Sequence, residues 1–218
     1  MIAYAASEAN PRSHAALLRA GWRTLLSPVR PAKLQPRGLQ YALDNGAWSA
    51  FSIGLPWDGD KYRKALRSLG ADADWVVLPD IVSGGMASLE LSMGWVQEAL
   101  DYSQRVLLPV QDGMDAKSVE GLLGNRVGVF VGGSTPFKEG TMAMWGQMAH
   151  RCGAWCHIGR VNTARRIRLC AAAGADSFDG SSVTRYAITL PKLDVARWQR
   201  DLFALGTLMT EDDMEEFQ

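Results

Sequence analysis

Short apolar runs alternate with longer amphipathic stretches along most of the chain. This alternation is typical of repeated strand and helix units that build a parallel sheet. Predicted strands cover residues 2–5, 24–26, 39–43, 75–78, 105–110, 127–131, 154–158 and 176–178. Predicted helices cover residues 13–20, 59–69, 87–102, 116–123, 138–151, 163–173 and 192–205. The pattern predicts an α/β fold, a compact (β/α)8 TIM barrel, with an open doubly wound sheet as the alternative.

Polar or glycine-rich groups follow several of these strands. They are Asp44-Asn45-Gly46, Pro79-Asp80, Gln111-Asp112-Gly113, Gly132-Gly133-Ser134, Gly159-Arg160 and Asp179-Gly180. Such residues are common in turns and helix caps, but the βα loops of a barrel all open onto one face, where these groups would meet. Two aspartates in one cleft indicate glycosyl chemistry, in which one carboxylate attacks a sugar carbon and the other moves protons.

Length and composition fit a single globular unit. The 218 residues are 47% hydrophobic, which is enough to bury a full core. We expect one catalytic barrel domain over residues 1–209 and an acidic, mobile tail over residues 210–218. No segment approaches the roughly 20 apolar residues that cross a bilayer, and the first residues lack the basic start of a signal peptide. The expected location is the cytoplasm, without a membrane partner.

The chain carries two short motifs, Asp44-Asn45-Gly46-Ala47-Trp48-Ser49 and Phe178-Asp179 followed after four residues by Thr184-Arg185. They resemble motifs of the queuine tRNA-ribosyltransferase, or tRNA-guanine transglycosylase, superfamily. Asp44-Asn45-Gly46-Ala47-Trp48-Ser49 is similar to the family's first catalytic segment, Asp-Ser-Gly-Gly-aromatic-Gln. Phe178-Asp179, four further residues and Thr184-Arg185 match its second. Asp80, Gln111 and the pair Gly132-Gly133 resemble the residues between them that read the base. The chain looks closest to the short phage and bacterial members that insert 7-deazaguanine bases into DNA.

The resemblance implies a pentosyltransferase that exchanges guanine in DNA for a free 7-deazaguanine such as preQ0, without a cofactor. Asp179 would attack C1′ to give a covalent aspartyl-sugar intermediate, and Asp44 would move the protons of the two bases. Asp80 would accept hydrogen bonds from the N1–H and the amine of the base. Gln111 and a backbone N–H of Gly132 or Gly133 would donate to its carbonyl, and Trp48 would stack on its ring.

The chain also departs from the tRNA enzymes. They carry a zinc subdomain of Cys-x-Cys-x-x-Cys and a later His after the nucleophile, whereas no cysteine or histidine follows Asp179 here. Part of the tRNA contact is expected in that subdomain, so its loss favours another polymer. Ala47 replaces the second glycine of the first segment, and the loop at Gly132-Gly133-Ser134 lacks the family's glutamate, which leaves the preferred base open.

The formal net charge of zero hides basic clusters. Arg185, Lys138 and Arg160 are the candidate contacts to phosphates, and the target nucleotide would be flipped out or single stranded. Arg165, Arg166 and Arg168 fit a solvated helix face better. If the chain is phage-encoded, it would act in the host cytoplasm, and other DNA-modification proteins are further expected partners.

A local group of His150, Cys152, Cys156 and His157 has spacings that zinc could use. Cys156 and His157 are adjacent in a predicted strand and would face opposite sides of it, so no metal site is predicted. Three other functions stay open: base exchange on tRNA or another RNA, glycoside hydrolysis with the same carboxylate pair, and non-catalytic binding of a nucleobase or nucleic acid. The set of Asp80, Gln111 and Gly132 suits a heterocycle better than a sugar.

Overall fold

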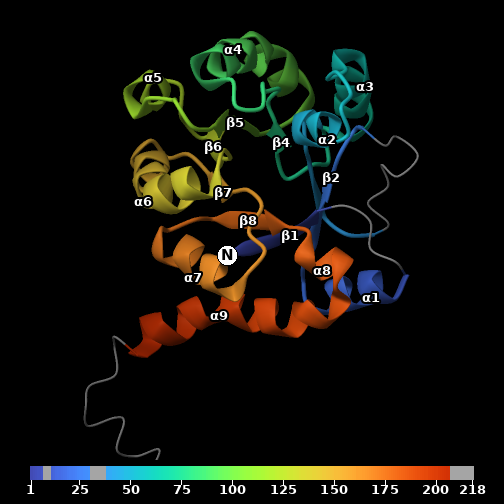
Figure 1. Ribbon diagram of the computed structural model, residues 1–218, viewed down its shortest axis with the longest axis vertical. Helices are drawn as coiled ribbons and strands as arrows, with labels where there is room; N and C mark the ends of the chain where they lie inside the picture. Colours follow the sequence, from blue (N-terminus) through green and yellow to red (C-terminus); the bar gives the residue numbers. More distant parts are fainter. Residues whose placement is uncertain (7–10, 30–37, 207–218) are drawn as a thin grey trace, which may run out of the picture.

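The computed structural model describes residues 1–6, 11–29 and 38–206, and it confirms the (β/α)8 barrel. All pairs of neighbouring strands are parallel, and β8 returns to β1 to close the barrel, with Asp179 opposite Tyr4 (Figure 1). The strands are β1 (Ile2–Ala6), β2 (Arg23–Leu26), β3 (Tyr41–Leu43), β4 (Val76–Val77), β5 (Val106–Val110), β6 (Val127–Val131), β7 (Cys156–Ile158) and β8 (Ser177–Gly180). The predicted acidic tail, residues 210–218, lies outside the described residues.

Seven predicted helices are present in the order expected. They are α1 (Pro11–Arg19), α3 (Gly59–Leu69), α4 (Gly85–Tyr102), α5 (Ala116–Glu120), α6 (Thr135–Arg151), α7 (Ala164–Ala172) and α9 (Leu190–Gly206). The long helix α9 crosses the outside of the barrel and packs on α7 (Figure 1). Two short helices that the sequence pattern did not predict, α2 (Ala47–Ser52) and α8 (Ser182–Arg185), follow β3 and β8, and the 3-10 helix η2 (Ala187–Thr189) comes after α8.

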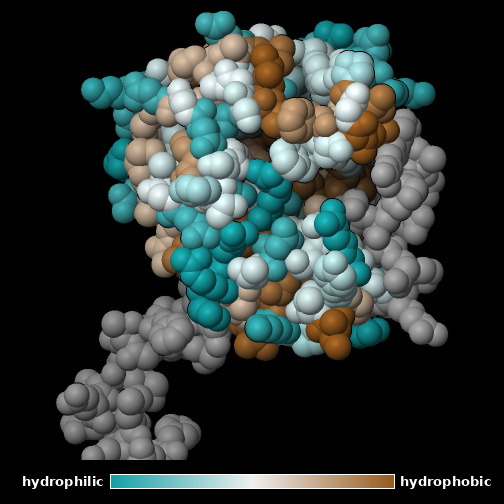
Figure 2. All heavy atoms as spheres, in the orientation of Figure 1, coloured by the Kyte–Doolittle hydropathy of each residue, from teal (hydrophilic) through white to brown (hydrophobic). Residues whose placement is uncertain are grey.

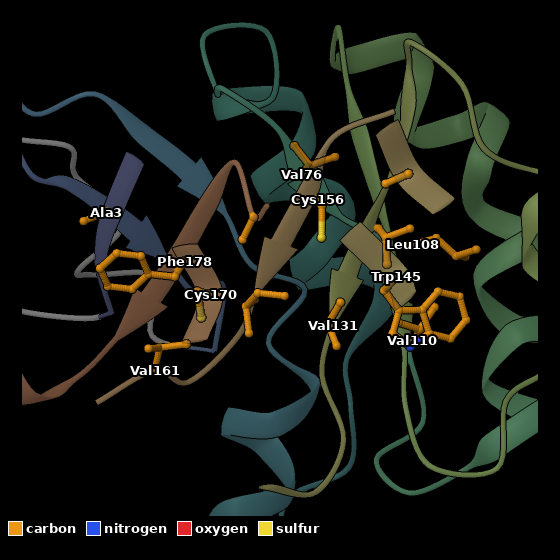
Figure 3. Packing of buried hydrophobic residues seen from close by; sticks show 14 of the residues in the cluster. Ala3, Val76, Leu108, Val110, Val131, Trp145, Cys156, Val161, Cys170 and Phe178 are labelled. Carbon is orange, nitrogen blue, oxygen red and sulfur yellow. The ribbon is translucent and has the colours of Figure 1, made fainter. Parts of the chain in front are cut away.

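The strands bury side chains on both faces, as parallel strands in a barrel must. One face fills the barrel interior with Tyr4, Leu25, Ala42, Trp75, Val77 and Leu107. The other face packs against the helices, where Val131, Cys156 and Phe178 join residues such as Trp145 (Figure 3). The interior is therefore filled by side chains, as is typical of this fold.

Strand limits differ from the sequence prediction at the two places that matter for the site. β4 is only two residues long, so Leu78 already belongs to the loop that leads to Pro79 and Asp80. β8 continues to Gly180, which places Asp179 inside the strand and not in the loop that follows it. The cause is pairing with β1, whose Tyr4 and Ala5 lie opposite Asp179 and Gly180.

Membrane insertion has no support in the helices. Within residues 1–6, 11–29 and 38–206, none combines the length and the apolar character that a membrane span requires.

Candidate functional site

A cavity of about 470 Å³ opens at the carboxyl ends of the strands. Its volume is in the range of small-molecule sites. Most of the predicted site residues line it: Asp44, Trp48, Asp80, Gln111, Gly132, Gly133, Arg160 and Asp179. Apolar walls come from Leu25, Val77, Val82, Pro109, Val110 and Phe130. The barrel thus brings Asp44 and Asp179 to one cavity, and the apolar walls around them suit a flat ring.

Asp44 is the first residue after β3, and its neighbours favour the protonated acid. Burial, which has the largest effect, and the charges of Asp179 and Asp80 together raise the pKa of Asp44 from 3.8 to about 7, although backbone N–H groups of Gly46 and Asn45 oppose the rise. The influence of Asp179 places the two carboxylates within electrostatic reach of each other. A carboxyl group that titrates near neutral pH can both give and take a proton.

Asp44→Asn is expected to stabilise the folded protein at alkaline pH. Because the folded-state pKa is raised, the folded protein binds this proton more tightly than the unfolded chain, and the free energy of unfolding falls as pH rises from about 4 to above 7. Asparagine does not titrate and removes that loss. The free energy of unfolding of the variant should therefore exceed that of the unaltered protein by roughly 2–4 kcal/mol at about pH 8.5, and the two should be nearly equal at about pH 4. Urea unfolding of both proteins at both pH values measures these free energies. The same difference in stability at both pH values would contradict a raised pKa for Asp44.

Asp80 is held in place by Asn45, a residue for which no role was predicted. The amide nitrogen of Asn45 donates to Oδ1 of Asp80 at 2.8 Å and to the carbonyl of Leu78 at 2.6 Å. Burial raises the pKa of Asp80, while the Asn45 hydrogen bond and the charge of Arg160 lower it. Asn45 itself is buried and accepts from the backbone N–H of Ala47 at 2.8 Å, at the start of α2. One oxygen of Asp80 is therefore fixed, and none of the described residues donates a hydrogen bond to the other.

Asp179 is almost fully buried in β8, and its Oδ1 has two partners. Nε2 of His157 lies 3.1 Å from Oδ1, and the backbone N–H of Arg160 donates to the same oxygen at 3.1 Å. His157 was considered in the sequence only as a weak metal ligand. The alternation of β7 was the signal that could have placed it, because Cys156 and Ile158 face the helices and His157 faces the interior.

Gln111 and the Gly132–Gly133 turn form the next wall. The side-chain amide of Gln111 donates to the carbonyl of Ile81 at 2.9 Å, which holds its head group beside the β4 loop. Asp112 accepts from the backbone N–H and the hydroxyl of Ser134, both at 2.6 Å, and so fixes the turn that leads into α6. Gly133 has a φ of 73°, and a Cβ there would lie 2.5 Å from an oxygen of Asp112, so the turn needs glycine.

Trp48 and Arg160 close one side of the cavity mouth. The guanidinium of Arg160 lies 4.2 Å from the centre of the Trp48 ring, a cation–π contact, and it also donates to the carbonyl of Gly133. Trp48 remains 46% exposed, and its neighbour Phe51 is 60% exposed. Apolar side chains reach the surface in the half of the molecule that holds α3 and α4 (Figure 2). Arg160 therefore already uses one face of the ring that was predicted to stack on a base.

Two of the predicted phosphate contacts are not at the cavity. Lys138 is buried, and its ammonium donates to the carbonyl of Gly159 at 2.7 Å. Burial, reinforced by the charge of Arg160, lowers the pKa of Lys138 to about 8. This position does not suit a contact to a polymer, and we do not retain Lys138 for that role. Arg185 is exposed at the end of α8, away from the cavity lining, while Thr184 anchors α8 by donating to the carbonyl of Ala6 at 3.0 Å.

The other basic and metal-like clusters have local partners. Arg165 and Arg166 both pair with Glu139, at 2.8 and 2.9 Å, which fits the solvated helix face expected for them. His150 contacts Asp176, whereas His157 contacts Asp179. In the part of the chain that the structure describes, no three His, Cys, Asp or Glu side chains converge in a way that could hold a metal ion.

No protein-family model and no curated protein matches the chain.

Proposed function

We propose that the protein is a base-exchanging transglycosylase that replaces guanine in DNA by a free 7-deazaguanine such as preQ0. One observation carries the proposal: Asp44 and Asp179, from opposite ends of the barrel sequence, line one cavity together with Asp80, Gln111 and the Gly132–Gly133 turn. The sequence resemblance to the tRNA-guanine transglycosylase superfamily supports the same chemistry. A cytoplasmic location belongs to this proposal.

The first half-reaction breaks the bond between C1′ and the base. The free oxygen of Asp179 attacks C1′, the C1′–N9 bond breaks with its electron pair on guanine, and Asp44 gives that base a proton. In the second half-reaction Asp44 takes a proton from the incoming base, whose nitrogen attacks C1′ and releases Asp179. The pKa of Asp44, raised to about 7, suits a group that must act in both directions.

Base recognition follows from the other hydrogen-bonding groups that line the cavity. A carboxylate accepts but does not donate when ionised, so Asp80 fits the N1–H and amine edge of a guanine-like ring. The side-chain amide of Gln111 has a second hydrogen besides the one that it donates to the carbonyl of Ile81. This hydrogen and a backbone N–H of Gly132 or Gly133 can donate to the ring carbonyl of the base. The apolar faces of Val77 and Phe130 suit the ring itself.

Charge balance at the cavity also favours a neutral ligand. Four carboxyl groups, those of Asp44, Asp80, Asp112 and Asp179, belong to the described lining, and Arg160 is the cation among these residues. With Asp44 protonated, the lining carries three negative charges and one positive charge, so it would repel an anionic ligand but not a neutral free base. This balance does not suit a phosphate inside the cavity, and the polymer backbone would stay at the rim near Arg160, with the exposed Arg185 as a contact further out.

Incorporation of labelled guanine tests the proposal. We expect label to enter DNA when the protein, radiolabelled guanine and either duplex or single-stranded DNA are incubated together, and we expect unlabelled 7-deazaguanine to chase it out. Entry into tRNA alone would contradict the choice of DNA and favour the RNA enzyme. Tight base binding without entry into any polymer would contradict catalysis and favour a binding protein.

A further inference from the structure

The interior of the barrel beneath the nucleophile contains a continuous row of polar groups. Trp155 Nε1 lies 2.9 Å from Ser177 Oγ, that oxygen lies 2.8 Å from His157 Nδ1, and His157 Nε2 lies 3.1 Å from Asp179 Oδ1. Ser177 and His157 have no exposed surface. The proposed mechanism uses none of these three side chains, and each of them has a hydrogen-bond partner, as most buried polar groups do.

With a neutral His157 and an ionised Asp179, which can only accept, chemistry fixes the direction of every hydrogen bond in this row. The indole N–H can only donate, so Ser177 accepts from Trp155 and has its own hydrogen left to give. If that hydrogen goes to Nδ1 of His157, the neutral ring carries its proton on Nε2 and donates it to Asp179. Burial lowers the pKa of His157, which favours this neutral ring, although the partner Asp179 opposes the shift. The row therefore ends in an N–H that points at the nucleophile.

The histidine ring has no freedom to turn away. Phe130 stacks on it with 4.8 Å between ring centres, Trp75 lies at 4.6 Å on a tilted plane, and Tyr4 meets it edge-on at 5.8 Å. Strand register also fixes the position of His157, because it lies directly opposite Ser177 in the β7–β8 pair. Ser177 precedes Asp179 by two residues, so both face the same side of β8. The donor is held in place before any substrate arrives.

We propose that His157 is a positioning residue for base exchange, and that it holds Oδ1 of Asp179 so that only the other oxygen attacks C1′. The inference rests on the proposed function. The N–H of His157 and the backbone N–H of Arg160 both donate to Oδ1, whereas no group among the described residues donates to the second oxygen of this cavity-lining side chain. A single attacking oxygen in a fixed orientation is a near-attack arrangement.

The same two donors act on the covalent intermediate. When the free oxygen bonds to C1′, Oδ1 becomes the carbonyl oxygen of the aspartyl ester and still accepts both hydrogen bonds. When the incoming base attacks, the C1′–O bond breaks and its electron pair returns to the carboxylate, whose charge spreads onto Oδ1. Donors that are already in place stabilise that developing charge. His157 thus assists the release of Asp179 without gaining or losing a proton.

Two substitutions of His157 separate this role from simple packing. His157→Leu keeps an apolar side chain of related size and removes the donor, so we expect the single-turnover exchange rate to fall about 10²-fold. The dissociation constant of the free base should change by less than about twofold, because Asp80 and Gln111 are untouched. His157→Gln retains an N–H at a similar reach and should recover at least about tenfold of the lost rate. Cys156→Ala, on the outward face of the same strand, is the control for loosened packing and should exchange at the unaltered rate.

Nitrogen NMR of the histidine rings gives a readout that does not depend on exchange. The chain has three histidines, and the signals that vanish in His157→Gln belong to His157. We expect the neutral ring with its proton on Nε2, and we expect Ser177→Ala to disturb that form. A charged ring, or a proton on Nδ1, would overturn the inference, as would unaltered exchange in His157→Leu. Failure of the unaltered protein to exchange bases would instead overturn the proposed function, and the role of His157 with it.

Discussion

Asp179→Asn is expected to abolish base exchange while leaving the fold and the affinity for free base nearly intact. Asparagine matches aspartate in size, and its carbonyl oxygen can still accept from His157 and from the N–H of Arg160. Its nitrogen then takes the place of the attacking oxygen and has no electron pair to offer C1′. Loss of a nucleophile costs on the order of 10⁴-fold or more in turnover. Labelled guanine incorporation measures the loss, and calorimetry measures base binding.

Asp176→Asn is the matched control for that experiment. Asp176 lies three positions earlier, just before β8, where its carboxylate accepts from the backbone N–H of Cys156 at 2.8 Å and contacts His150 at 3.3 Å. It is not part of the cavity lining. The control should exchange at the unaltered rate, and a denaturing gel should show a protein–DNA adduct with the control and none with Asp179→Asn. Exchange that survives in Asp179→Asn would assign the nucleophile elsewhere.

The barrel could be predicted from the sequence because its signal is distributed over the whole chain. Alternation between strand and helix periods recurs so often that an error of a few residues in any element leaves the topology unchanged. Strand ends were less predictable, since β8 runs through Asp179 only because β1 lies beside it. The helix α2 was missed because Asp44, Asn45 and Gly46 are typical turn residues, and its six residues carry little periodicity.

The residues that line the cavity could be predicted because polar groups follow the strands in the sequence. The side chains that hold those residues in place could not be predicted. Asn45 belonged to a predicted motif, yet its bond to Asp80 depends on how two loops meet in space. His157 was grouped with nearby cysteines because they are close in sequence, whereas its partner Ser177 is set by strand register. Lys138 was assigned to the surface by its charge, while the interior face of α6 buries it against Gly159. Contacts between strands and helices distant in sequence require the register that only the folded chain supplies.

Asp80→Asn is expected to weaken guanine binding by about 10²–10³-fold, because the edge of the base loses two hydrogen bonds to a charged acceptor. The structure also fixes how the new amide would lie. Asn45 donates to Oδ1 of Asp80, so the carbonyl oxygen of the introduced asparagine would take that place and its NH₂ would face the cavity. A guanine amine would then meet another donor.

The reversed donor predicts a reversed preference. Xanthine carries a carbonyl where guanine carries its amine, so Asp80→Asn should bind xanthine more tightly than guanine, whereas the unaltered protein should prefer guanine. Calorimetric titration of both proteins with both bases measures the four affinities. Combining Asn45→Ala with Asp80→Asn tests whether Asn45 causes this preference. Without the Asn45 donor the introduced amide could rotate, so the preference for xanthine should shrink. Equal losses for both bases in Asp80→Asn would show that Asp80 does not read this edge of the ring.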